Sequence, residues 1–264
     1  MITKMSIILF LNFVWSYPLF LWLTPEIELK KEFFRFNLGL SIVVGFCALF
    51  ISFFKSSLGL FDFILLPIFI CNISWLGILF LLTWYFWNSG KFPMLIITFI
   101  STFGLFITYW IIKDILQYHS NIGGFIIGAM ALSSVIFTMI LGHWYLNVPG
   151  LSIYFIRRSV VILGIVLLIR LIWNFWLVNF TTINQKFTGE IPIIYYLQTF
   201  EGVFLWIAIL FGLIGAIIIN ILTYKTVKIH STQSATGLLY VNLVIILMAE
   251  MIFKYYMIHI GLIL

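Results

Sequence analysis

The chain has 264 residues, of which 64% are hydrophobic and 8% are charged. Soluble domains contain about 45–50% apolar and about 25% charged residues, so these values and the mean hydropathy of +1.20 exclude a soluble globular protein. The net charge of +6 would suit a nucleic-acid-binding protein, but the basic residues lie in short loops between apolar stretches, where they set membrane topology. The sequence therefore predicts an integral membrane protein that contacts the lipid bilayer and binds no nucleic acid.

Eight apolar stretches are long enough to cross a bilayer core, which needs about 20 residues of helix. Pro18 and Pro67 fall inside the first and third stretches and predict kinks there. No hydrophilic stretch is long enough for a soluble domain, so residues 1–264 are expected to form a single polytopic, all-α transmembrane domain. The stretches cover residues 6–23, 38–54, 60–87, 93–113, 122–146, 159–178, 201–223 and 236–262.

The loops between these stretches divide the Lys and Arg residues unequally. By the positive-inside rule, the side with more of them faces the cytoplasm. This predicts that the odd-numbered loops are cytoplasmic and that both termini lie outside, in the cytoplasmic (inner) membrane if the source is bacterial. The odd loops contain eight such residues, Lys30, Lys31, Arg35, Lys91, Arg157, Arg158, Lys225 and Lys228, and the other side contains four, Lys4, Lys55, Lys113 and Lys186.

Three polar residues share one face of the last stretch. At about 100° per residue, Glu250 and Lys254 lie about 40° apart, and Asn242 lies about 80° to the other side of Glu250. Arg170 of the sixth stretch lies at a matching depth, about 18 Å from the cytoplasmic side against about 20 Å for Glu250. We therefore predict that Arg170 and Glu250 are neighbours in the bundle interior. Lys254 can pair with Glu250 at i,i+4 and is expected to extend outward to the membrane surface.

The role of the Arg170–Glu250 pair has two interpretations. The pair could form a proton relay or a polar wall beside a quinone headgroup, or it could be a structural ion pair that fixes helix register. Four further residues are candidates for the same quinone or proton pathway. His143 lies near the cytoplasmic end of the fifth stretch, where it could either interact with the helix dipole or bind a ligand or handle protons. The other three residues lie near the outer surface, either as solvated helix ends or as the lining of a pocket: Asp62, Glu201 and His119.

The chain lacks the sequence motifs of several common catalytic and cofactor-binding sites. It has no phosphate-binding loop, no dinucleotide fingerprint, no HExxH and no GxSxG, so no catalytic residue is named. Its two cysteines form no CxxC motif and no metal site is expected. No haem is expected either, because His119 and His143 are separated by about 36 Å along a helix, more than the hydrocarbon core. Gly124 and Gly128 form a GxxxG motif, which we interpret as helix packing and not chemistry.

The tail AEMIFKYY, from Ala249 to Tyr256, resembles the ending of membrane anchor subunits of the dimethyl-sulfoxide-reductase and polysulfide-reductase type. Those subunits often end with Gly-Glu, a basic residue one turn later and aromatic residues; here Ala249 replaces the Gly and Lys254 stands where an Arg is usual. The resemblance covers fewer than a dozen residues. It implies two four-helix bundles, no cofactor of the chain's own, both termini outside, and quinol oxidation or quinone reduction together with an iron–sulfur subunit on the outer face.

These observations predict a membrane subunit of a respiratory-type electron-transfer complex that binds quinone or quinol and passes electrons and protons to partner subunits. Such a chain is at most a non-catalytic or quinone-binding subunit of an oxidoreductase. Two alternatives stay open: a small-molecule transporter or flippase, and a purely structural assembly subunit. A transporter predicts interrupted helices in corresponding positions of two halves, and the fifth and seventh stretches contain no Pro to match Pro18 and Pro67.

Overall fold

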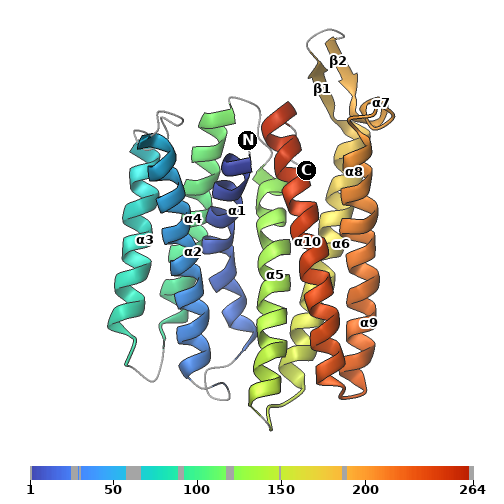
Figure 1. The fold of residues 1–264 in the computed structure, drawn as a ribbon. Helices are drawn as coiled ribbons and strands as arrows, with labels where there is room; N and C mark the ends of the chain where they lie inside the picture. The colour runs from blue at the N-terminus through green and yellow to red at the C-terminus, as the bar shows by residue number, and fades with distance from the viewer. Residues whose placement is uncertain are drawn as a thin grey trace. The chain divides into compact units, whose positions relative to one another are not determined.

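The computed structural model describes residues 2–24, 29, 31–57, 67–88, 92–116, 122–148, 150–185 and 189–261. Apart from one small hairpin, these residues form helices and short connections (Figure 1). The protein is therefore an all-α polytopic membrane protein, as predicted. The predicted single transmembrane domain divides into two compact units, residues 1–117 and 118–264.

Within its described residues, the first unit is a bundle of four spans, the first of which continues from α1 into a short 3-10 helix. Each helix packs on the next along the chain, and the last packs on the first, so the ring is closed. Neutral polar side chains join the helices inside it: the Tyr17 hydroxyl donates to Asn37 Oδ1, and Asn72 donates to the Thr108 hydroxyl at 2.9 Å. The elements are α1 (Ile2–Ser16), the 3-10 helix η1 (Tyr17–Leu23), α2 (Lys31–Ser57), α3 (Pro67–Tyr85) and α4 (Met94–Leu116).

The first span changes from α-helical to 3-10 geometry next to Pro18, the second residue of η1. Proline has no N–H, so it cannot continue the ladder of helical hydrogen bonds. The helix thus changes its geometry at Pro18, while the kink predicted there stays a prediction. The other predicted kink, at Pro67, stays a prediction, because α3 begins at Pro67 and the preceding residues 58–66 lie outside the described residues.

The second unit is also a closed ring of four spans. The spans are α5 (Ile122–Asn147), α6 (Tyr154–Phe180), a composite of α8 (Val203–Ile207), the π-helix η3 (Ala208–Gly215) and α9 (Ala216–Lys228), and α10 (Thr232–Ile260). α5 packs on both α6 and α10, and α9 packs on both as well. α6 and α10 are therefore diagonal to each other, and side chains that reach from one to the other must cross the bundle interior.

A small structure connects α6 to α8 where only a loop was expected. Strands β1 (Thr182–Gln185) and β2 (Gly189–Pro192) form an antiparallel hairpin in which Thr182 pairs with Pro192. The helix α7 (Ile193–Tyr196) follows it directly. Ile193 and Tyr196 are buried in an apolar cluster that includes Leu205 and Phe253, so α7 is anchored to the ends of α8 and α10.

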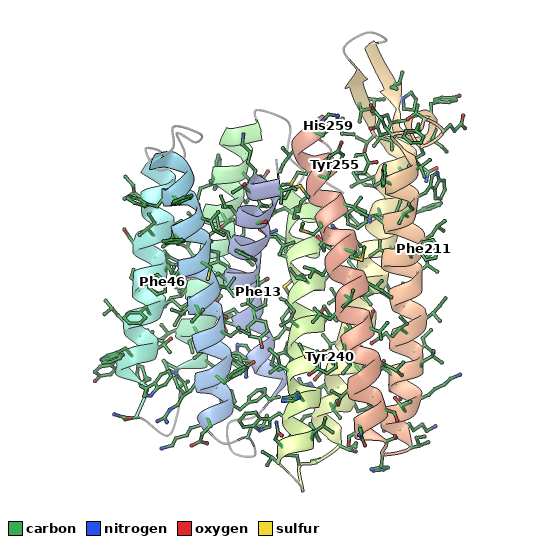
Figure 2. All side chains as sticks on the ribbon, in the orientation of Figure 1. Phe13, Phe46, Phe211, Tyr240, Tyr255 and His259 are labelled. Carbon is green, nitrogen blue, oxygen red and sulfur yellow. The ribbon has the colours of Figure 1, made fainter. Side chains whose placement is uncertain are left out.

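Seven helices in the described ranges are long and apolar enough to cross a membrane. They match seven of the eight predicted stretches; the third, α3, has a shorter apolar part, Ile70–Tyr85. Large apolar side chains such as Phe46 and Phe211 are exposed on the outward faces (Figure 2). Contact with lipid tails explains this exposure, since water would disfavour it. The spans are Ile2–Leu23, Lys31–Phe54, Met94–Lys113, Ile122–Asn147, Tyr154–Phe180, Val203–Lys228 and Thr232–Ile260.

Candidate functional site

Arg170 and Glu250 form an ion pair inside the second unit. Arg170 Nη2 lies 3.0 Å from Glu250 Oε1, and the two side chains are 0% and 3% exposed. Each residue lies ten positions before the end of its helix, which is Phe180 for α6 and Ile260 for α10. Because the two helices run in the same direction, equal spacing brings the residues to the same depth. The predicted pairing of Arg170 with Glu250 is confirmed.

The ion pair fits into a gap that α5 leaves at Gly128. A Cβ atom added to Gly128 would lie 2.8 Å from Arg170 Nη2 and 2.9 Å from Glu250 Oε2, closer than real Cβ contacts allow. One turn earlier, the Gly124 carbonyl accepts a hydrogen bond from Arg170 Nη1 at 2.7 Å. The GxxxG motif thus packs α5 against the ion pair itself: Gly128 makes room for the pair, and the Gly124 carbonyl accepts a hydrogen bond from it.

Lys254 is the third charge of this group. Its Nζ lies 3.8 Å from Glu250 Oε2, as the i,i+4 spacing predicted. The predicted outward extension of the side chain was wrong, because Lys254 is only 2% exposed and its Nζ lies over the Phe125 ring, 5.7 Å from the centroid. We call Arg170, Glu250 and Lys254 the ion cluster. Among the described side chains, one buried carboxylate thus faces two buried cations.

Two buried asparagines in the same unit lack hydrogen-bond partners. Asn242 was predicted to share the face of Glu250 and is buried in α10. Asn174 lies one turn after Arg170 in α6 and was not singled out from the sequence, although its i,i+4 spacing from a charged residue in an apolar helix is a usable signal. Neither side-chain amide has a hydrogen-bond partner within the described part of the chain. Buried polar groups in proteins are nearly always paired, so each exception needs an explanation.

Glu201 lies at the same end of α10 as the ion cluster but does not join it. Its carboxylate accepts a hydrogen bond from the Tyr196 hydroxyl at 3.2 Å, and its backbone carbonyl accepts one from the Tyr256 hydroxyl. Burial raises the pKa of the Tyr196 hydroxyl well above its ordinary value, and the charge of Glu201 adds to the shift. Tyr196 therefore stays protonated and acts as a donor that holds the exposed Glu201 side chain in place.

His143, a further candidate, is not brought to the ion cluster. His143 is exposed and lies 15 residues after Gly128 on α5, about 22 Å along the helix, where its Nδ1 is 3.4 Å from the Tyr240 hydroxyl. It belongs to the opposite end of the unit. Asp62 and His119 lie outside the described residues.

The ion cluster buries one more positive than negative charge, with cations at 3.0 Å and 3.8 Å from the Glu250 carboxylate. It can therefore stabilise negative charge that develops beside it. In the described ranges, no group of three His, Cys, Asp or Glu side chains is placed to hold a metal ion. Comparisons of the chain with protein-family models, with curated proteins and with solved structures found no match.

Proposed function

We propose that this protein is a membrane subunit of an electron-transfer complex, in which it binds quinone or quinol and hands electrons to a partner subunit outside the membrane. One observation carries the proposal. Glu250 and Lys254, the two charged residues of the tail that resembles anchor subunits, are both buried in one ion cluster. Both residues thus lie in the bundle interior, where they can act together on a bound quinone.

The ion cluster buries three charges, one more than an ion pair contains. A charged side chain near the bilayer centre costs about 2.5–3.5 kcal/mol on insertion scales. A purely structural pair needs one cation and one carboxylate, whereas this cluster adds a second cation. The third charge is accounted for if Glu250 accepts a proton while the Lys254 ammonium releases one, because the net charge of the ion cluster then stays at +1 during the exchange.

Oxidation of one quinol releases two electrons and two protons and leaves a quinone. The electrons pass to the iron–sulfur partner, and the protons need acceptors on the protein before they reach water. Among the described side chains Glu250 is the only buried carboxylate, so we assign it the first acceptor role. Glu201, exposed at the same end of the unit, would pass protons on to water.

The proposal also includes the orientation of the chain in the membrane and the side of the membrane on which the partner docks. Arg157 and Arg158 lie near the start of α6, and Lys225 and Lys228 lie in the last turn of α9. Both helix ends are at the end of the second unit opposite the hairpin (Figure 1). With that end facing the cytoplasm, the hairpin and α7 face the outer side, where the electron-accepting partner would dock.

The test uses the protein purified in mild detergent together with any co-purifying subunits. We expect it to retain quinone and to transfer electrons from an added quinol to an artificial acceptor. Glu250→Asp keeps the charge but withdraws the carboxylate by one methylene, which we expect to lower turnover about 10²-fold while the complex stays assembled. Glu32→Asp, at an exposed carboxylate in the first turn of α2, serves as the control and should leave turnover unchanged.

The alternatives give different results in the same preparation. A transporter would retain no quinone, would not oxidise quinol, and would take up a solute in reconstituted vesicles. Transporters built on repeats interrupt corresponding helices of their two halves, whereas the irregular segments η1 and η3 fall in the first and seventh spans, which do not correspond. A purely structural subunit would support full turnover of the complex with Glu250→Asp in place.

A further inference from the structure

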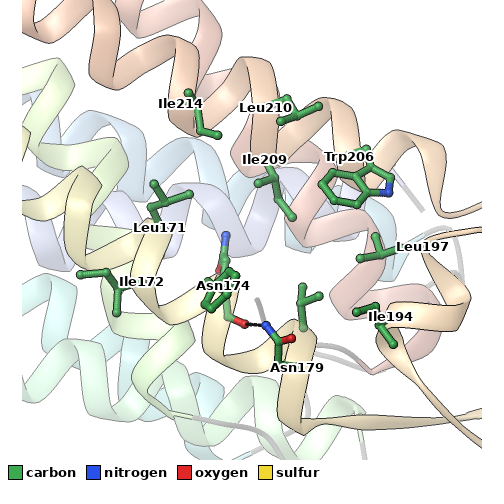
Figure 3. A pocket seen from close by; sticks show the side chains of 12 residues that line it. Leu171, Ile172, Asn174, Asn179, Ile194, Leu197, Trp206, Ile209, Leu210 and Ile214 are labelled. Carbon is green, nitrogen blue, oxygen red and sulfur yellow. Dashed lines mark hydrogen bonds between the residues drawn. The ribbon is translucent and has the colours of Figure 1, made fainter.

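A pocket of about 510 Å³ lies in the second unit between α6, α7 and the α8–η3 segment. Sites for small molecules have about this size and are mostly apolar with a few polar groups. Figure 3 shows Asn174 in the α6 wall, with Ile209 and Leu210 of η3 across from it. The π-helical geometry of η3 is notable because such segments are frequent at functional sites.

Asn174 is the feature that points to a ligand. Its side chain is fully buried, it lines the pocket, and both its amide nitrogen and its amide oxygen lack partners in the described part of the chain. Burying an unpaired amide in an apolar site costs about 1–3 kcal/mol by mutational measures. Both amide atoms are buried, so a molecule with one polar oxygen removes this penalty when a lining side chain shifts to admit that oxygen.

The lining also restricts the chemistry of the occupant. None of the described lining residues is charged, so the pocket offers no cation to the phosphate of a phospholipid. Trp206 and Phe175 provide aromatic surface, and Ile172 and Phe175 are exposed at the rim by 67% and 72%. Since these residues belong to membrane-spanning helices, the pocket opens toward lipid and admits a neutral, lipid-soluble molecule.

We propose that this pocket is where quinone and quinol bind, with one ring oxygen at the Asn174 amide and the isoprenoid tail leaving toward the lipid. The inference rests on the proposed function and adds the location of the binding site. An amide suits both redox states: its nitrogen donates to a quinone carbonyl, and its oxygen accepts from a quinol hydroxyl. Asn174 lies one turn after Arg170, about 6 Å along α6, so the ring binds next to the ion cluster.

The experiment maps a short-tailed photoreactive azidoquinone on the purified protein with any co-purifying subunits. Labelled peptides are identified by mass spectrometry, and the affinity is taken from the concentration dependence of labelling. Asn174→Leu removes only an unpartnered amide, so folding should persist while affinity falls about tenfold through loss of one hydrogen bond. Ile209→Trp fills the pocket and should abolish labelling. Asn242→Leu, at a buried and equally unpartnered amide outside the pocket, is the matched control and should bind as wild type.

Labelling within residues 171–179 or 206–214 that weakens in both pocket variants and not in the control supports the inference. If quinol is oxidised normally but the label falls elsewhere, or if Asn174→Leu binds as wild type, the pocket assignment is overturned while the proposed function stands. If excess phospholipid, and not excess quinone, prevents labelling of these residues, the pocket is a lipid site and the inference is overturned. A wild-type protein that neither binds nor oxidises quinol overturns both proposals.

Discussion

Replacing Glu250 by Leu should destabilise the protein much more than replacing Arg170 by Leu, because the two changes leave different charges behind. Without Glu250, the guanidinium of Arg170 and the ammonium of Lys254 stay buried with no carboxylate between them. Without Arg170, Glu250 keeps the Lys254 ammonium at 3.8 Å. The first variant therefore leaves two buried cations unpaired, whereas the second leaves one neutral pair of Glu250 and Lys254.

The magnitudes follow from the burial of the three side chains, each exposed by 3% or less. Leaving a buried charge without its partner costs about 3–5 kcal/mol, which is the expected loss for Glu250→Leu. Arg170→Leu loses the charged hydrogen bond to the Gly124 carbonyl and the ion pair itself, about 1.5–3 kcal/mol. The difference between the two variants is thus about 2 kcal/mol.

Variants with two or three substitutions test the role of Lys254 directly. If Arg170 and Glu250 were an isolated pair, replacing both by Leu would restore stability. With Lys254 buried beside them, the double variant still contains one unpaired ammonium and stays destabilised by about 3–5 kcal/mol. Adding Lys254→Met to the double variant should recover most of that loss, because an apolar replacement of a whole buried ion group is often neutral or stabilising.

Reversible unfolding in mixed detergent micelles, followed by circular dichroism, gives the free energies of unfolding for this series. Equal losses for Arg170→Leu and Glu250→Leu would refute the reasoning. Full recovery in the Arg170→Leu, Glu250→Leu double variant would show that Lys254 is not part of the ion cluster.

Three further expectations can be checked independently. Gly128→Ala puts a methyl group onto the ion cluster and should cost about 1–3 kcal/mol of stability in the same unfolding assay, whereas Gly77→Ala, where an added Cβ meets nothing within 4 Å, should cost nothing. Cysteines introduced at Lys30 and Gln185, with the two native cysteines replaced, should be labelled from opposite sides of the membrane; labelling from one side contradicts the topology. Tyr256→Phe removes the hydrogen bond from α10 to the segment before α8 and should cost about 1 kcal/mol, and an unchanged unfolding free energy would show that this bond contributes nothing.

The spans and the Arg170–Glu250 pairing could be predicted from the sequence because lipid imposes strict rules. A segment that crosses the bilayer must be apolar and helical, which makes each span visible as a continuous stretch. A charge inside such a stretch needs a partner at its own depth, and depth can be counted from the helix ends. Span length and depth are both distances along a single helix, which the sequence gives directly.

The features that were missed depend on which helices are neighbours. The contact between Gly128 and the ion cluster could be recognised only after α5 was known to pack on both α6 and α10. The burial of Lys254 depends on the Phe125 ring of α5. The pocket at Asn174 depends on the π-helical segment η3, and an apolar run of residues has no pattern that separates π from α geometry.

The hydrogen bond between Arg170 and the Gly124 carbonyl has a consequence for biogenesis. Glu250 is synthesised 80 residues after Arg170, which takes roughly 4–16 s at about 5–20 residues per second. During that time α6 must remain in the membrane with a guanidinium whose carboxylate does not yet exist. Gly124 precedes Arg170 in the chain, so the helical hairpin of α5 and α6 can satisfy one arm of the guanidinium as soon as it inserts. The Gly124 carbonyl thus serves as a temporary partner that stabilises α6 in the bilayer until α10 is inserted and Glu250 pairs with Arg170.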